Sequence, residues 1–216
     1  MVSPFGVGPI LKLFKGNIMS LNPTTKLEAV NMLLEGIMEA PVNSVDGSGL
    51  QEADLASVML DRISRSIQKK GWHWNTLVNY VITPDTDGNI ILPKTTLSVD
   101  TMGKSCHLDL VQRGSKLYNR ETNTFNIGVP VTVEIVLNLP YEELPENARW
   151  FIAVQATRKF QQKLLGSSEL SQFDQSDEQD AYFDMIDEES DTRDHNMLRD
   201  SLSVRRILNR THFSGS

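Results

Sequence analysis

The chain has 216 residues, of which 39% are hydrophobic and 23% are charged, so it has the length and composition of an ordinary globular protein with a buried core. Its single cysteine, Cys106, excludes an intramolecular disulfide, and because no apolar run reaches about 18 residues, no segment is predicted to span a membrane. The net charge of −7 is unevenly spread. Residues 169–191 hold ten acids and no Lys or Arg, and residues 193–216 hold five Arg and two Asp. The net charge of the remaining residues is zero.

Residues 1–23 are predicted to be an N-terminal extension. A secretory signal begins with its positive charge and continues with an unbroken apolar core. Here Lys12 and Lys15 lie within or after the apolar residues, so the sequence argues against such a signal.

Two helices are predicted after this extension. The first begins at Thr25, because Thr25 and Glu28 have the spacing of a capping box, in which each side chain accepts a hydrogen bond from the other residue's backbone N–H. It ends before Pro41, and the second helix covers roughly residues 50–70. Apolar residues recur at helical spacing along one face of each helix, which predicts that the two helices pack in one bundle.

Residues 72–139 are predicted to form a small antiparallel β domain that is inserted into the helical bundle. Short β-rich runs alternate there with turn signals such as DTDGN and RGS. The runs predicted to form its single sheet are WHWNT, LVNYVIT, IILP, HLDLVQ, KLYN and VTVEIVLNL.

The third predicted helix, Leu144 to Gly166, carries the most complete helical signals in the chain. Pro145 and Glu146 suit a first helical turn, and Gly166 suits the left-handed residue that closes a helix. Its apolar stripe consists of Ala153, Ala156, Phe160 and Leu164, with Trp150 at the edge. The opposite, polar arc consists of Gln155, Arg158, Lys159, Gln162 and Lys163. A helix with two such faces needs a partner for each.

An acidic, amphipathic fourth helix is predicted between Gly166 and Asp191, and residues 192–216 are predicted to be a C-terminal tail. The predicted fold class is therefore α+β. It consists of a bundle of about four helices, built from residues 24–71 and 140–191, with the inserted β domain and an extended C-terminal tail. The acidic segment followed by a basic one indicates surfaces of association rather than a small-molecule pocket.

Cys106, His107 and Asp109 lie close together in the sequence and raise the question of a metal site. Such a site needs three or four convergent ligands, and the other histidines are scattered along the chain. A strand would also direct Cys106 and His107 to opposite faces. We therefore predict no metal and no other cofactor.

Two acidic groups could be read as the carboxylate pair of a glycan hydrolase. The groups are Glu142, Glu143 and Glu146 before the third helix, and residues 187–189. The positive end of the helix dipole already explains acids at a helix start, so catalysis stays the alternative reading.

Tryptophan and basic residues could also indicate a nucleic-acid-binding protein, which is a second alternative. Trp72, Trp74 and Trp150 could stack on bases, but a tryptophan at the boundary of an element is more often a packing anchor. The body of the chain is not basic, which argues against a specific nucleic-acid reader.

Four stretches of the chain resemble one known family in order and spacing. They are LEAVNMLLEGIMEAPVNSV, MLDRISRSIQKKGWHWN, YNRETNTF and EELPENARW with its continuation FIAVQATRKFQQKLLG. The family is tail tubular protein A, the adaptor or gatekeeper proteins of short-tailed bacteriophages related to T7. The resemblance covers roughly residues 24–168.

The resemblance implies a structural protein of the virion tail, assembled in the host cytoplasm, and no enzyme. Members of the family form a twelve-subunit ring below the portal and above the tail nozzle, around a channel for the genome. The implied partners are further copies of the chain, the portal protein, a nozzle similar to tail tubular protein B and the tail fibre. Genomic DNA would be a non-specific passenger, and no membrane is involved.

Three sets of residues are candidates for contacts in such a ring. Contacts between subunits are predicted for Gln155, Arg158, Lys159, Gln162, Lys163, Arg62 and Arg65. Portal docking is predicted for Leu198, Arg199, Leu202, Arg205, Arg206 and Ile207, where apolar and basic residues alternate. A position facing the channel is predicted for Asp177, Asp180 and Asp184, whose carboxylates would repel DNA phosphates.

Overall fold

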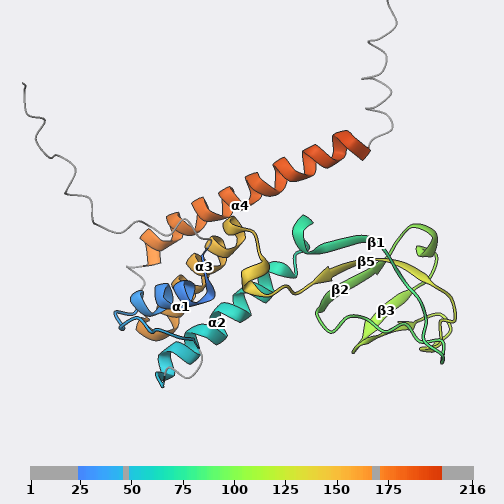
Figure 1. Cartoon of the computed structure of the whole chain (residues 1–216), viewed down its shortest axis with the longest axis horizontal. Helices are drawn as coiled ribbons and strands as arrows, with labels where there is room; N and C mark the ends of the chain where they lie inside the picture. Colours follow the sequence, from blue (N-terminus) through green and yellow to red (C-terminus); the bar gives the residue numbers. More distant parts are fainter. Residues whose placement is uncertain (1–23, 46–48, 167–170, 201–216) are drawn as a thin grey trace, which may run out of the picture.

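The structure of the chain, a computed structural model, describes residues 24–45, 49–166 and 171–200. A helical part and a β part lie end to end (Figure 1). The predicted α+β fold class is confirmed, since the described residues contain four α-helices and two small antiparallel sheets. The predicted N-terminal extension, residues 1–23, lies outside the described residues.

The helical part is formed by α1 (Lys26–Glu35), α2 (Gln51–Gln68), α3 (Glu146–Leu165) and α4 (Ser171–Asp200). The β part is formed by β1 (Thr76–Ile82), β2 (Thr96–Thr101), β3 (Leu110–Arg113), β4 (Lys116–Asn119) and β5 (Val131–Leu137). Three short 3-10 helices accompany them: η1 (His73–Asn75), η2 (Gly103–Ser105) and η3 (Tyr141–Glu143).

Local signals in the sequence set several helix ends where they were predicted. The Thr25 hydroxyl accepts the Glu28 N–H at 3.2 Å, and the Glu28 carboxylate accepts the Thr25 N–H at 2.8 Å, which completes the capping box of α1. Gly166 closes α3 in the left-handed region, with φ of 62°. Helix α1 is shorter than predicted, because Gly36 rather than Pro41 follows its last residue.

The helical part has its own hydrophobic core, to which all four helices contribute. Ala153, Ala156 and Phe160 of the predicted stripe are buried on α3. Leu164, the predicted end of that stripe, is 45% exposed instead. The reason is that Gln161 already reaches the end of α1, where its amide donates to the Gly36 carbonyl, so the next turn of α3 lies beyond α1.

The β part contains two sheets rather than the single predicted one. Strands β1, β5 and β2 form an antiparallel sheet in the order β1-β5-β2, and β3 pairs with β4. A second core lies between these sheets, with Val131, Val133 and Ile135 of β5 at its centre. Strand β2 was not predicted, and the predicted strand at residues 72–76 is mostly the 3-10 helix η1.

Two buried amide side chains join the helical part to the β part. The Gln68 side chain accepts the Leu139 N–H at 2.7 Å and donates to the Leu139 carbonyl at 3.0 Å. The Asn75 amide donates to the carbonyls of Gln68 and Leu137, each at 2.9 Å. The chain leaves the bundle and returns to it at this junction, so the same polar groups fix both crossings. The division into separate domains at these positions stays a prediction.

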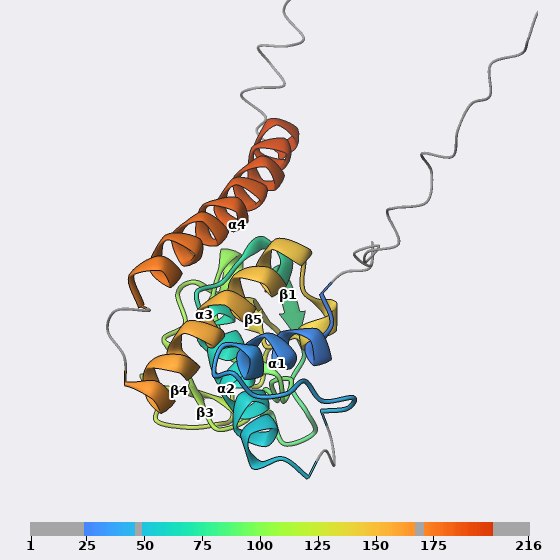
Figure 2. The same cartoon turned by 90° about the vertical axis from the view of Figure 1, so that its left-hand side faces the viewer.

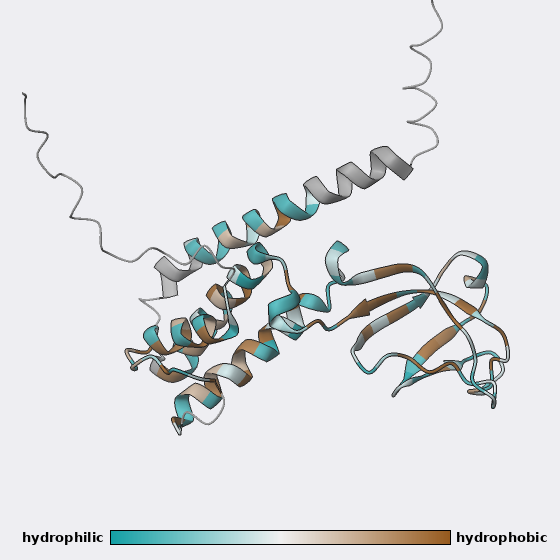
Figure 3. Ribbon diagram, in the orientation of Figure 1, coloured by the Kyte–Doolittle hydropathy of each residue, from teal (hydrophilic) through white to brown (hydrophobic). Residues whose placement is uncertain are grey.

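Helix α4 lies along the outside of α3 and extends well beyond the bundle (Figures 1 and 2). Over residues 176–190, the coloured part of α4 in Figure 3, hydrophilic residues alternate with a few apolar ones. The position of α4 on the bundle therefore depends on its contacts with α3.

Candidate assembly surfaces

Over residues 176–190, whose side chains the structure describes, helix α4 contacts the bundle through Ala181, Tyr182, Met185 and Ile186. Ala181 and Met185 are each 2% exposed and are the α4 members of the buried core. The Tyr182 ring lies 5.3 Å from the Phe151 ring, and the Lys70 ammonium group lies 5.3 Å from the centre of the same Tyr182 ring. These contacts tie α4 to both α3 and the end of α2.

A polar cluster completes this packing at the centre of the α3–α4 contact. The Glu178 carboxylate of α4 forms an ion pair with the Arg158 guanidinium of α3 and accepts a hydrogen bond from the Gln155 amide at 2.6 Å. The side chains of Arg158 and Glu178 are only 20% and 13% exposed. Gln155 and Arg158, both predicted to contact a neighbouring subunit, therefore have partners within their own chain.

The other residues predicted to contact neighbouring subunits lie at the surface. Gln162 and Lys163 are exposed near the end of α3, and Lys159 is half-buried one turn earlier. Arg62 and Arg65 are exposed on α2. Their roles in contacts between subunits stay predictions.

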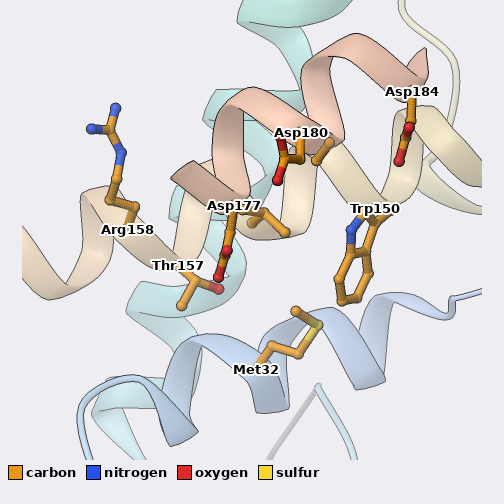
Figure 4. A pocket seen from close by; sticks show the side chains of 9 residues that line it. Met32, Trp150, Thr157, Arg158, Asp177, Asp180 and Asp184 are labelled. Atoms are coloured by element: carbon orange, nitrogen blue, oxygen red, sulfur yellow. The ribbon is translucent and has the colours of Figure 1, made fainter. Parts of the chain in front are cut away.

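The three aspartates predicted to face a channel line one pocket. Asp177, Asp180 and Asp184 are exposed on α4, and the pocket has a volume of about 380 Å³. It lies between α1, α3 and α4 (Figure 4). The remaining lining residues are Met32, Trp150, Val154, Thr157, Arg158 and Ala181.

Helix α4 continues past the predicted start of the C-terminal tail at residue 192 and ends at Asp200. Residues 192–200 contain neither Gly nor Pro, and extending an existing helix adds one backbone hydrogen bond per residue. Leu198 and Arg199 thus belong to the last turn of α4. The other predicted portal-docking residues, Leu202, Arg205, Arg206 and Ile207, lie outside the described residues.

Two acids named above as candidates for a hydrolase pair or a metal site, Glu146 and Asp109, make contacts that stabilise the fold. Glu146 accepts two hydrogen bonds from Thr24, through the backbone N–H at 2.8 Å and the hydroxyl at 2.5 Å, and so anchors the start of α1 to the start of α3. Asp109 forms an ion pair with Arg120 at 3.4 Å. Within the part of the chain that the structure describes, no three His, Cys, Asp or Glu side chains are grouped to hold a metal ion.

Trp72 and Trp74 pack against each other, whereas Trp150 is exposed. Trp72 is the predicted packing anchor: it is 8% exposed, and its indole N–H donates to the Ile67 carbonyl at 2.8 Å. Trp74 lies parallel to it, with ring centres 6.4 Å apart. Trp150 is 44% exposed and lines the pocket that contains Asp177, Asp180 and Asp184, so it is not a packing anchor.

Comparisons with known proteins agree on one family. A sequence model of the family described as tail tubular protein matches residues 27–195. Tail tubular protein A of Klebsiella phage KP34 is 32% identical over 132 residues, which are 61% of this chain and 69% of that protein. Among the described residues, no helix is both long and apolar enough to cross a lipid bilayer.

Proposed function

The chain belongs to the tail tubular protein family, and we propose that it is the subunit of a ring that connects the portal of a short-tailed phage to its tail nozzle. As a member of this family it is a structural component of the virion tail and not an enzyme. The proposal adds the adaptor role, a twelve-subunit ring and a central conduit for DNA ejection.

The single observation that supports an adaptor most directly is the separation of the chain into two different ends. Helices α1, α2 and α3 lie at one end of the molecule and the β part at the other, while α4 starts at the helical end and its far end projects beyond the junction (Figure 1). A subunit of this shape offers one end to each of two partners. We assign the helical end and α4 to the portal, and the β part to the nozzle and the tail fibre.

Opposite charges on different helices support a ring closed by head-to-tail contacts. Arg62 and Arg65 of α2 and Lys163 of α3 are exposed cations, whereas α4 is strongly acidic. In a ring every subunit uses two different surfaces, one on each side. We propose that the cations of one subunit face the acidic helix of the next, and that genomic DNA passes through the centre without specific contacts.

An image of the purified chain mixed with its portal protein tests the proposal. We expect electron microscopy to show a twelvefold collar on one end of the portal. The variant Arg62→Glu/Arg65→Glu should reduce the fraction of complete collars at least threefold, while Lys94→Glu, an exposed change in the β part, should leave it unchanged. A portal decorated by separate monomers, or no binding at all, would contradict the adaptor role.

A further inference from the structure

The pocket between α1, α3 and α4 has the chemistry of a site for a basic, apolar peptide segment. Its inner surface is apolar, with Met32 of α1 and Trp150 and Val154 of α3. Trp150 is 44% exposed although it lies among these apolar side chains. In Figure 4 its indole ring lies above Met32 at one end of the pocket. An aromatic surface of this kind is suited to cover by another apolar side chain.

The α4 side of the same pocket is acidic. Asp177, Asp180 and Asp184 are spaced so that they share one face of the helix, and they span about 10 Å at a rise of 1.5 Å per residue. Arg158 is the basic residue of the lining, and it is paired with Glu178. The three carboxylates therefore give this edge of the pocket a net negative charge.

We propose that this pocket binds residues 9–15 of the same chain, whose sequence is PILKLFK. The apolar residues of the segment, Leu13 and Phe14 among them, would cover Trp150 and Met32. Lys12 and Lys15 would contact the carboxylates of α4. Bound in this way, the N-terminal extension would contact α1, α3 and α4 at once and stabilise their packing.

The chain connectivity supports binding within one molecule. Thr24, the first described residue, is hydrogen-bonded to Glu146, which lies one helical turn before Trp150 on α3. One turn is a distance of about 6 Å along the helix axis. The nine residues from Lys15 to Thr24 can span up to about 30 Å when extended. The segment can therefore reach the pocket without strain, and the covalent connection gives it a high effective concentration there.

The second basic, apolar segment of the chain is less suited to this pocket. Residues 198–210 begin 14 positions after Asp184 along α4, which is about 21 Å at the helical rise. That stretch of α4 leads away from the bundle (Figure 1). The same segment from a neighbouring copy is a competing occupant that the test separates.

A photocrosslinking group in the pocket of the full chain tests the proposal. The variant Trp150→p-benzoylphenylalanine places a reactive aromatic ketone at the proposed contact. We expect crosslinks inside the monomer, located by mass spectrometry in residues 9–15. The matched control is Phe183→p-benzoylphenylalanine, at a 59% exposed aromatic position of α4 outside the pocket lining, and it should not label this segment.

Charge variants separate specific binding from chance proximity. Asp180→Lys/Asp184→Lys should lower the yield of the crosslink at least threefold, and adding Lys12→Glu/Lys15→Glu should restore it. Asp187→Lys, at an exposed position of α4 outside the pocket, should leave the yield unchanged. If the Trp150 variant does not fold, Asp184→p-benzoylphenylalanine provides the same readout.

Three results would overturn the proposal. They are crosslinks to residues 198–210, crosslinks that join two copies of the chain, and the absence of any crosslink from a folded variant. All measurements use the isolated full chain, so they are independent of ring formation and of the portal. They also separate two roles for the three aspartates, because residues facing a DNA channel have no reason to contact residues 9–15.

Discussion

Gln68 is a polar side chain with 0% exposure, and its amide makes three hydrogen bonds at the junction of the two parts. Two of them pair both backbone groups of Leu139, and the third goes to Ser64. Buried backbone groups that lose their partner cost more than an average hydrogen bond contributes. Gln68 and Asn75 together therefore account for the polar contacts described at the junction, and Gln68 pairs both backbone groups of Leu139.

We expect Gln68→Ala to lower the free energy of unfolding by about 2–4 kcal/mol, because it leaves the Leu139 N–H and carbonyl unpaired inside the protein. Urea denaturation followed by circular dichroism measures this change. Gln51→Ala, at the exposed start of the same helix, is the matched control and should cost no more than about 0.5 kcal/mol. Equal losses in the two variants would show that the junction does not depend on the Gln68 amide.

Tyr141 gives the stability of the protein a dependence on alkaline pH. Burial raises the pKa of its phenol above the ordinary value, and the nearby Glu146 carboxylate raises it further. The unfolded chain therefore loses this proton at about pH 10, before the folded protein does. Stability is complete below that pH and falls above it, by at most about 1.4 kcal/mol per pH unit.

Tyr141→Phe should make the decline above pH 10 shallower. At pH 7 the variant should lose about 1 kcal/mol, since the phenol donates a hydrogen bond to the Arg149 carbonyl at 2.9 Å. Denaturant titrations between pH 7 and 11 measure both effects. Tyr80→Phe, which removes a phenol that is 41% exposed, is the matched control. Parallel profiles for all three proteins would contradict the prediction.

At the scale of elements, the described side chains of α4, residues 176–190, hold it through both apolar and polar contacts. Ala181, Tyr182, Met185 and Ile186 provide the apolar contacts, Glu178 pairs with Arg158, and the Glu189 carboxylate accepts the His73 N–H at 2.7 Å. These positions follow one face of the helix from its second turn to the junction with the β part. Polar contacts at Glu178 and Glu189 therefore flank a narrow apolar face on this helix.

We expect Arg158 and Glu178 to be coupled by about 1–3 kcal/mol in a double-mutant cycle, because both side chains are largely shielded from water. The variants are Arg158→Met, Glu178→Gln and their combination, compared by their free energies of unfolding. The Lys26–Asp61 ion pair between α1 and α2 is the control, since Asp61 is 52% exposed, and its coupling should stay below about 1 kcal/mol. A weaker coupling for the shielded pair would contradict this assignment.

Features set by residues close together in the sequence were predicted correctly, whereas contacts between residues far apart in the sequence were missed. The capping box at Thr25 and the closing Gly166 are local, and both were predicted correctly. Strand β2 was missed although Leu97 and Val99 alternate with Thr, Ser and Asp as in a half-buried strand, because the run is short and its pairing with β5 joins residues more than 30 positions apart. The partners of Gln155 and Arg158 were missed for the same reason, since Glu178 lies on a helix with a weak apolar pattern.

For the whole molecule, the predicted portal contact can be separated from folding. Glu189 is the last buried side chain within residues 176–190, the part of α4 whose side chains the structure describes. A chain truncated after Asp191 keeps that contact and the core, so it should remain folded. We expect this truncation to weaken binding to the portal at least tenfold, measured by biolayer interferometry, with a melting curve like that of the full chain. A truncation that binds with full affinity would remove residues 192–216 from the portal contact.

The junction at Gln68 has a consequence for how this protein can be altered. The first residue of β1 and the end of β5 are paired neighbours, Thr76 opposite Val136. The β part is therefore an insert between α2 and α3 whose two ends lie next to each other. The entropic cost of closing such an insert grows only with the logarithm of its length. A graft that keeps Gln68, Asn75 and Leu139 should thus fit an unrelated module onto the same bundle. The end proposed to contact the nozzle can then be exchanged while the helical end stays the same.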